Sequence, residues 1–136
     1  MNVDWEGLLP IKETVIVVED DPTLRSLMKG VLTEVGVQTL AFDTADDALI
    51  ALQQSHESCS LVIVDQGLPG RIQGTEFIKM VHSRWPSIAA VLTSGYSINP
   101  LDVPICAIYL QKPWSLDELM TSVADALQLG KLLSNR

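Results

Sequence analysis

The chain has 136 residues, of which 47% are hydrophobic and 19% are charged, so its composition is that of one globular domain rather than of a disordered segment. Its formal net charge is −8, and its nine lysine and arginine residues are scattered along the sequence. Because a nucleic-acid surface needs clustered basic side chains, direct binding of nucleic acid is not expected. The sequence shows no apolar run of membrane-spanning length and no signal peptide, which predicts a cytoplasmic protein without membrane insertion.

Five short segments rich in β-branched and apolar residues have the length of strands. In chain order they are 14–18, 37–42, 61–65, 89–94 and 105–110. Amphipathic segments with the apolar spacing of helices lie between and after them, most clearly at 24–35 and 116–127. This alternation predicts an α/β fold in which a parallel sheet is wound by right-handed crossovers and covered by helices on both faces.

The starts of several helices are marked by capping residues. Asp21 directly precedes Pro22, which combines an N-cap residue with proline at the first helical position. Thr44 precedes another apolar helical segment, and SLDE at 115–118 has the pattern of a capping box. These signals predict helices that begin immediately after the ends of strands or short loops.

An acidic cluster follows the first predicted strand in the stretch VIVVEDDP, residues 15–22. Glu19 and Asp20 end this strand, and Asp65 ends the third strand. If the strand order is the flavodoxin-like 2-1-3-4-5, these three carboxylates meet at the carboxyl edge of the sheet, where ligands of such folds bind. Like charges at one place are relieved by a hard divalent cation, and Mg²⁺ accepts carboxylate oxygens readily. Helix capping explains Asp21 but not the other three residues.

Two further polar side chains are predicted at the same edge. Thr93 ends the fourth strand, and Lys112 follows the fifth. With a metal ion, the hydroxyl group of Thr93 and the ammonium group of Lys112 could share the negative oxygens of a bound phosphoryl group.

Four motifs carry a resemblance to a known family. VIVVEDDPTLR, VIVDQGLPG, VLTSGYS and YLQKPWSLDEL occur in this order, each at the end of a predicted strand. Together they resemble the receiver (phosphoacceptor) domain of bacterial two-component response regulators. The resemblance implies a flavodoxin-like doubly wound (βα)₅ fold with a five-stranded parallel sheet of order 2-1-3-4-5. We expect a tail at 1–12, the receiver domain at 13–129 and a second tail at 130–136.

The resemblance also implies roles for the clustered residues. Asp65 matches the aspartate that accepts the phosphoryl group. Glu19, Asp20, Asp65 and the backbone carbonyl of Gly67 match the Mg²⁺ site of the family, in which Asp20 would be a direct ligand and Glu19 would act through water.

Three further residues match catalytic and switch positions of such domains: Lys112 is catalytic, Tyr109 belongs to the switch, and Thr93 belongs to both. Thr93 matches the hydroxyl residue that follows the phosphoryl group, and Tyr109 matches the aromatic residue that changes rotamer. Lys112 matches the lysine that bridges to the phosphorylated aspartate, and its bond to Pro113 matches a peptide bond that is usually cis.

The function implied by the resemblance is a signalling switch. A sensor histidine kinase or a histidine phosphotransfer protein would donate a phosphoryl group to Asp65 in a Mg²⁺-dependent reaction, and the new conformation would act on an unknown downstream protein. Phosphotransfer and dephosphorylation would be self-catalysed, so the protein would be a phosphoacceptor switch rather than a turnover enzyme. The alternative is a receiver-fold module that binds proteins independently of phosphorylation.

The sequence departs from the family pattern in two segments. The loop GRIQ at 70–73 is one residue longer than is usual, and Arg71 in it is expected to be exposed to solvent. The segment 95–109 is short and contains Pro100 and Pro104, which interrupt helices. We therefore expect the helix between the fourth and fifth strands to be short, displaced or unwound.

Two other classes are disfavoured by particular residues. A haloacid-dehalogenase-like phosphatase needs a second aspartate two residues after the nucleophile, where this chain has Gly67. A flavin-binding flavodoxin-like protein needs a phosphate-binding loop after the first strand, and the acidic residues at 19–21 would repel phosphate there.

Overall fold

The computed structural model describes residues 13–134. Its elements are β1 (Thr14–Val18), α1 (Pro22–Glu34), β2 (Thr39–Phe42), α2 (Ala45–Ser55), the 3₁₀ turn η2 (His56–Ser58), β3 (Cys59–Asp65), α3 (Gly74–Arg84), β4 (Ala89–Ser94), the 3₁₀ turn η3 (Pro100–Asp102), β5 (Ala107–Gln111) and α4 (Leu116–Ser134). All five predicted strands are confirmed, with ends displaced by up to two residues.

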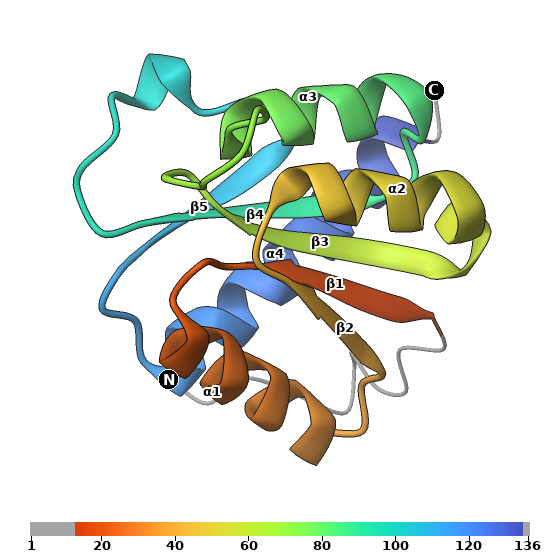
Figure 1. Ribbon diagram of the computed structural model, residues 1–136. Coiled ribbons are helices and arrows are strands. Elements are labelled where there is room, and N and C mark those ends of the chain that lie inside the picture. The colour runs from red at the N-terminus through yellow and green to blue at the C-terminus, as the bar shows by residue number, and fades with distance from the viewer. Residues whose placement is uncertain (1–12, 135–136) are drawn as a thin grey trace.

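The strands form one parallel sheet of order β2-β1-β3-β4-β5, which confirms the predicted topology. Helices α2 and α3 cover one face of the sheet, and α1 and α4 cover the other (Figure 1). Each face has its own apolar core: Phe77 and Ile78 of α3 lie in the first, and Met28 of α1 and Leu119 of α4 lie in the second. The central strands are apolar toward both faces because helices cover both.

Side-chain caps begin the helices at the predicted positions. The Asp21 carboxylate accepts hydrogen bonds from the amides of Thr23 and Leu24 at 2.9 and 3.3 Å, and the hydroxyl group of Thr44 accepts one from Asp47. Ser115 and Glu118 exchange the two hydrogen bonds of a capping box, as predicted. The caps fix the points at which the chain turns from strand ends into helices.

The connection from β4 to β5 contains only the three-residue turn η3, which confirms the prediction that no ordinary helix forms there. Asn99 caps this turn, and Pro100 occupies its first position. Ile98 and Val103 pack against the core on the α3 side. In an ordinary crossover between parallel strands, a helix would cover this area instead. Figure 1 shows the segment projecting beyond the sheet next to α3.

The predicted N-terminal tail at 1–12 lies outside the described residues, and α4 continues to Ser134, beyond residue 129. Cys59 and Cys106 are both buried free thiols. Within residues 13–134, none of the helices combines the length and the apolar character needed to cross a membrane.

The start of α3 lies so close to the end of β3 that residue 74 has no room for a side chain. A methyl group at Gly74 would collide with the carbonyl oxygen of Asp65, whereas one at Gly30 would meet no atom within 4 Å. Gly74→Ala should therefore lower the free energy of unfolding by about 1–3 kcal/mol, as overpacking does. Gly30→Ala, in the middle of α1, should leave it unchanged or raise it by about 0.5–1 kcal/mol. Urea denaturation measures both, and equal effects would contradict the close approach.

Candidate functional site

The polar residues predicted to meet do so because parallel strands end at one edge of the sheet. Val18 pairs with Val64, so Glu19 follows β1 beside the end of β3, and Asp65 pairs with Thr93 of β4. Glu19, Asp65 and Thr93 are only 2%, 7% and 1% exposed. Burial of two carboxyl groups at one place costs free energy unless they are paired, which indicates a functional site.

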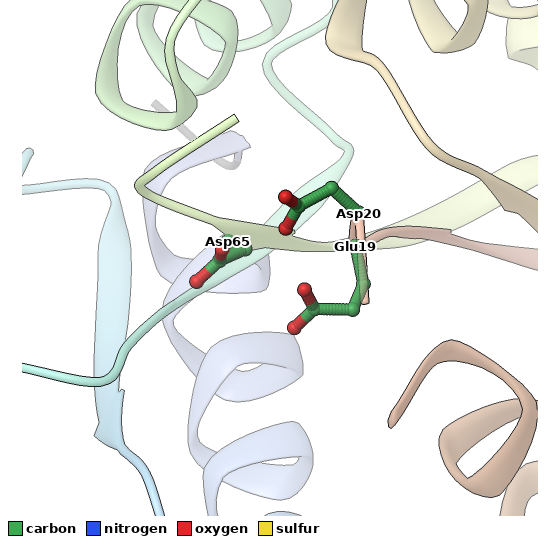
Figure 2. A group of neighbouring side chains, drawn as sticks. All are labelled: Glu19, Asp20 and Asp65. Atoms are coloured by element: carbon green, nitrogen blue, oxygen red, sulfur yellow. The ribbon is translucent and has the colours of Figure 1, made fainter. Parts of the chain in front are cut away.

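The carboxyl groups of Glu19, Asp20 and Asp65 form a compact cluster (Figure 2). Each offers one oxygen atom, and these three atoms lie within 4.8 Å of one another. Asp20 is exposed, while the other two residues are buried. The cluster therefore has one side open to solvent, through which an ion or a phosphoryl group could enter.

Lys112 brings one positive charge into this cluster. Its Nζ atom lies 2.6 Å from Oε1 of Glu19 and 3.1 Å from Oδ1 of Asp65. The amide of Lys112 donates to the carbonyl oxygen of Ser94 at 2.8 Å, which holds the lysine backbone beside the end of β4. When all are ionised, the three carboxylates of the cluster and this one ammonium group carry an excess of two negative charges.

The pKa values reflect this imbalance. Burial raises the pKa of Glu19, and the hydrogen bond from Lys112 offsets only part of the effect. Burial likewise raises the pKa of Asp65, with a further upward contribution from the charge of Asp20. Burial alone would lower the pKa of Lys112, but its hydrogen bonds to both carboxylates outweigh this and raise it. Lys112 is thus stabilised in its charged form, whereas the positive charge near Glu19 and Asp65 is too small to offset the burial of their carboxylates.

The three carboxylates differ in how many hydrogen bonds they already accept. Oε1 of Glu19 accepts from Lys112, and Oε2 accepts from the amide of Asp21 at 3.1 Å. Within the described residues, the Asp20 carboxylate accepts no hydrogen bond and forms no ion pair. Asp20 therefore has the most freely available oxygens of the cluster.

A residue that sequence reasoning missed, Arg25, supports the cluster from behind. Nη1 of Arg25, in the second turn of α1, donates to the carbonyl oxygen of Glu19 at 2.8 Å and to that of Asp20 at 3.5 Å. These contacts go to the backbone and not to the carboxylates. Arg25 thus holds the turn after β1 in the conformation that directs the acidic side chains into the site.

Two further supports lie in the loop between β3 and α3. Oε1 of Gln66 accepts from the amide of Thr75 at 2.9 Å, which ties the residue after Asp65 to the first turn of α3. Oδ1 of Asp46 accepts from the amides of Arg71 and Ile72 at 3.1 and 3.4 Å. Arg71 is exposed, as expected, and the long loop is held by α2 through Asp46.

The remaining predicted residues lie around this centre. Gly67 is exposed in the turn after Asp65, and its role as a carbonyl ligand stays a prediction. Tyr109 is half-buried, and its hydroxyl group donates to the carbonyl oxygen of Tyr96 at 2.9 Å, in the loop after β4. The peptide bond between Lys112 and Pro113 is cis, as the resemblance implied.

The donor set fits a hard divalent cation. The side-chain ligands of the cluster are all carboxylate oxygens, from two buried residues and one exposed residue, and they carry an excess of negative charge. Oxygen-rich acidic sites favour Mg²⁺ and Ca²⁺ over softer metals. Asp20 and Asp65, with Glu19 behind them, could hold such an ion.

Comparison with known proteins gives a consistent picture. A family model described as the response regulator receiver domain matches residues 15–124. The chain is similar to the hydrogenase transcriptional regulatory protein HoxA of Cupriavidus necator, with 32% identity over 120 residues, which are 85% of this chain and 24% of that protein. It is also similar to the C4-dicarboxylate transport transcriptional regulatory protein DctD of Pseudomonas aeruginosa, with 30% identity over 127 residues, which are 90% of this chain and 27% of that protein.

The chain therefore spans about a quarter of the length of these curated relatives. Among solved structures, the response regulator receiver domain protein from Clostridium thermocellum matches with a TM-score of 0.75 at 23% identity. The match covers 89% of this chain and 98% of that one. At this identity, the likeness is one of fold.

The raised carboxyl pKa values predict how Asp65 affects stability. A carboxyl group with a raised folded-state pKa stabilises the fold fully below its ordinary pKa, 3.8 for Asp65, and loses this contribution as pH rises through the raised value. Asp65→Asn, which buries no charge, should therefore raise the melting temperature of the metal-free protein by about 2–5 °C near pH 8. It should have little effect near pH 3.5. The exposed Asp125→Asn is the control, and a destabilising effect of Asp65→Asn near pH 8 would contradict the sign.

The backbone contacts of Arg25 predict an indirect effect on metal affinity. Arg25→Ala should weaken Mg²⁺ binding about tenfold, as loss of an outer support does, because the turn that carries Asp20 is released. Isothermal titration calorimetry with MgCl₂ measures this directly. Lys29→Ala removes a charge from the exposed side of α1 and should change the affinity less than twofold, whereas equal effects of the two variants would indicate charge alone.

Proposed function

This chain belongs to the response regulator receiver domain family of two-component signalling, and we propose that its receiver domain, residues 13–129, accepts a phosphoryl group on Asp65 in a Mg²⁺-dependent reaction. The observation that carries the proposal is the position of the Asp65 carboxylate. It is buried at a strand end, within 4.8 Å of the other two carboxylates and 3.1 Å from the ammonium group of Lys112.

The proposed step is the transfer of a phosphoryl group from a donor nitrogen or oxygen to Asp65. An oxygen of Asp65 forms a bond to phosphorus while the bond between phosphorus and the donor breaks, and the donor leaves with the bonding electron pair. The product is an acyl phosphate. Attack of water on phosphorus later releases inorganic phosphate and restores the carboxylate.

The surrounding residues would stabilise the charge that this step creates. Bound Mg²⁺ would supply positive charge for the phosphoryl oxygens, with Asp20, Asp65 and the Gly67 carbonyl as ligands and Glu19 acting through water. Lys112 already contacts Asp65, so its ammonium group could move from Glu19 to a phosphoryl oxygen over a short distance. The hydroxyl group of Thr93, on the strand beside Asp65, could donate to another.

The switch would follow from these new contacts. Movement of Thr93 and Lys112 toward the phosphoryl group would free space beside β4, into which Tyr109 could turn. In the described structure the hydroxyl group of Tyr109 donates a hydrogen bond to the carbonyl oxygen of Tyr96. Inward rotation of the Tyr109 side chain would break this hydrogen bond and release the loop after β4.

The expected donors are a sensor histidine kinase or a histidine phosphotransfer protein. Response regulators receive their phosphoryl group from such partners, and family membership makes a histidine kinase partner the general expectation for this chain. The relatives HoxA and DctD are transcriptional regulators about four times longer than the matched region.

Phosphorylation with a small donor tests the proposal. Incubation with MgCl₂ and acetyl phosphate, followed by intact-mass measurement, should show one phosphoryl adduct per chain. Asp65→Asn and an excess of chelator should each abolish it, because they remove the acceptor and the metal. Lys112→Ala should reduce the adduct by at least about tenfold, since a charge-stabilising group is lost.

Asp125→Asn is the matched control, because it removes an exposed carboxylate far along α4. It should be phosphorylated to the same extent as the unaltered chain. No adduct with acetyl phosphate or with a panel of phosphohistidine donors would overturn the proposal. A receiver-fold module that binds proteins independently of phosphorylation would then be the better description.

A further inference from the structure

Two large aliphatic side chains on the segment between β4 and β5 project into solvent. Leu101 is 90% exposed and Ile105 is 91% exposed, more than any other large hydrophobic residue in the described part of the chain. They are four residues apart, on either side of Val103, which packs against the core. The segment is thus anchored in its middle while it presents an apolar side chain at each end, and such exposure indicates a contact surface.

A groove lies beside these side chains. It has a volume of about 570 Å³ and is bounded on one side by Lys79, His82 and Ser83 of α3. The other side is formed by residues 101–106, which include Leu101 and Ile105. The same face therefore carries two projecting aliphatic groups and a hollow that can accept groups of that size.

Two opposite charges also line this groove. Lys79 and Asp102 both border it, and both are exposed. Neither forms an ion pair within the described residues, where the ion pairs of the carboxylate cluster all involve Lys112. A cation and an anion are thus available on one face without being neutralised by each other.

We propose that two copies of this chain associate about a twofold axis through this face, with Leu101 and Ile105 of each copy in the groove of the other. In a twofold interface the same patch meets itself, so each feature needs its complement on the same patch. The projecting side chains and the groove satisfy this for shape. Lys79 and Asp102 satisfy it for charge, because each can face its opposite on the partner copy twice per dimer.

A second groove shares Lys79, Leu101 and Asp102 with the first, so it belongs to the same face. Two grooves elsewhere on the described structure lack a pair of opposite charges. The groove between β5 and α4 is lined by Asp117 and Glu118 without a basic residue, so two copies would repel each other there. The apolar groove beside α1 has Lys112 as its only charged residue. For a chain of net charge −8, association of two copies is most favourable where opposite charges can be paired.

Sedimentation equilibrium of the unphosphorylated, metal-free chain tests this independently of phosphotransfer. The measurements cover about 1 μM to 1 mM protein, the range in which weak dimers dissociate. The unaltered chain should show a monomer–dimer equilibrium. Leu101→Ser with Ile105→Ser should raise the dimer dissociation constant at least about tenfold, because the apolar contacts are lost from both copies.

A charge exchange tests whether Lys79 and Asp102 meet across the twofold axis. Lys79→Glu alone should weaken the dimer about tenfold or more, because it places like charges opposite each other twice. Lys79→Glu combined with Asp102→Lys restores opposite charges and should return the dissociation constant to within about threefold of the original. Circular dichroism checks that each variant is folded.

The matched controls alter the same residue types elsewhere on the surface. Ile50→Ser on α2, where the side chain is 55% exposed, and Lys29→Glu on α1 should leave the dissociation constant unchanged. A chain that stays monomeric up to about 1 mM would overturn the proposal. So would a dimer that is insensitive to the Leu101 and Ile105 substitutions, or one that the charge exchange fails to restore.

Discussion

The site depends on one ammonium group that must serve two buried carboxylates. Lys112 follows the edge strand β5 but contacts Glu19 after β1, which is 93 residues away in sequence and lies beyond β4 and β3 in the sheet. Its side chain therefore ties together the ends of strands that do not pair directly. One ammonium group cannot neutralise three carboxylates, so the pocket retains negative charge at a cost in folding free energy. That residual charge is the physical basis for binding a cation and, through it, a phosphoryl group.

The central residues of the site could be predicted from sequence because their positions follow from strand ends alone. Glu19 and Asp20 follow β1, Asp65 is the last residue of β3, and Thr93 is the last but one of β4. Parallel strands end at one edge of the sheet, which brings these residues together. Arg25 and Asp46 could not be placed in this way, because they bind backbone groups of turns whose paths depend on the folded structure. One feature of the sequence could have indicated the contact of Arg25 with the carbonyl oxygen of Glu19. Arg25 lies only six residues after Glu19, in the helix that directly follows the strand.

The segment between β4 and β5 shows how a local sequence signal changed the surface of a common fold. The shortness of this segment and its two prolines, Pro100 and Pro104, predicted a helix that is short, displaced or unwound, and the structure has a single 3₁₀ turn there. What they could not predict is that Ile98 and Val103 would cover the core. Pro104 and Cys106 are buried as well, whereas residues 99–102, between Ile98 and Val103, remain at the surface.

The site and this segment are connected through Ser94, the last residue of β4. Its carbonyl oxygen accepts a hydrogen bond from the amide of Lys112. Its hydroxyl group donates to the carbonyl oxygen of Tyr96 at 2.8 Å and accepts from the amide of Tyr96 at 3.2 Å. Tyr109 donates to the same carbonyl oxygen of Tyr96, so strand β5 holds the start of the loop at a second point. A displacement of Lys112 would therefore act on the loop through shared hydrogen bonds rather than through a helix. Because that loop continues into Leu101, a change at the carboxylates could alter the face through which we infer that two copies associate.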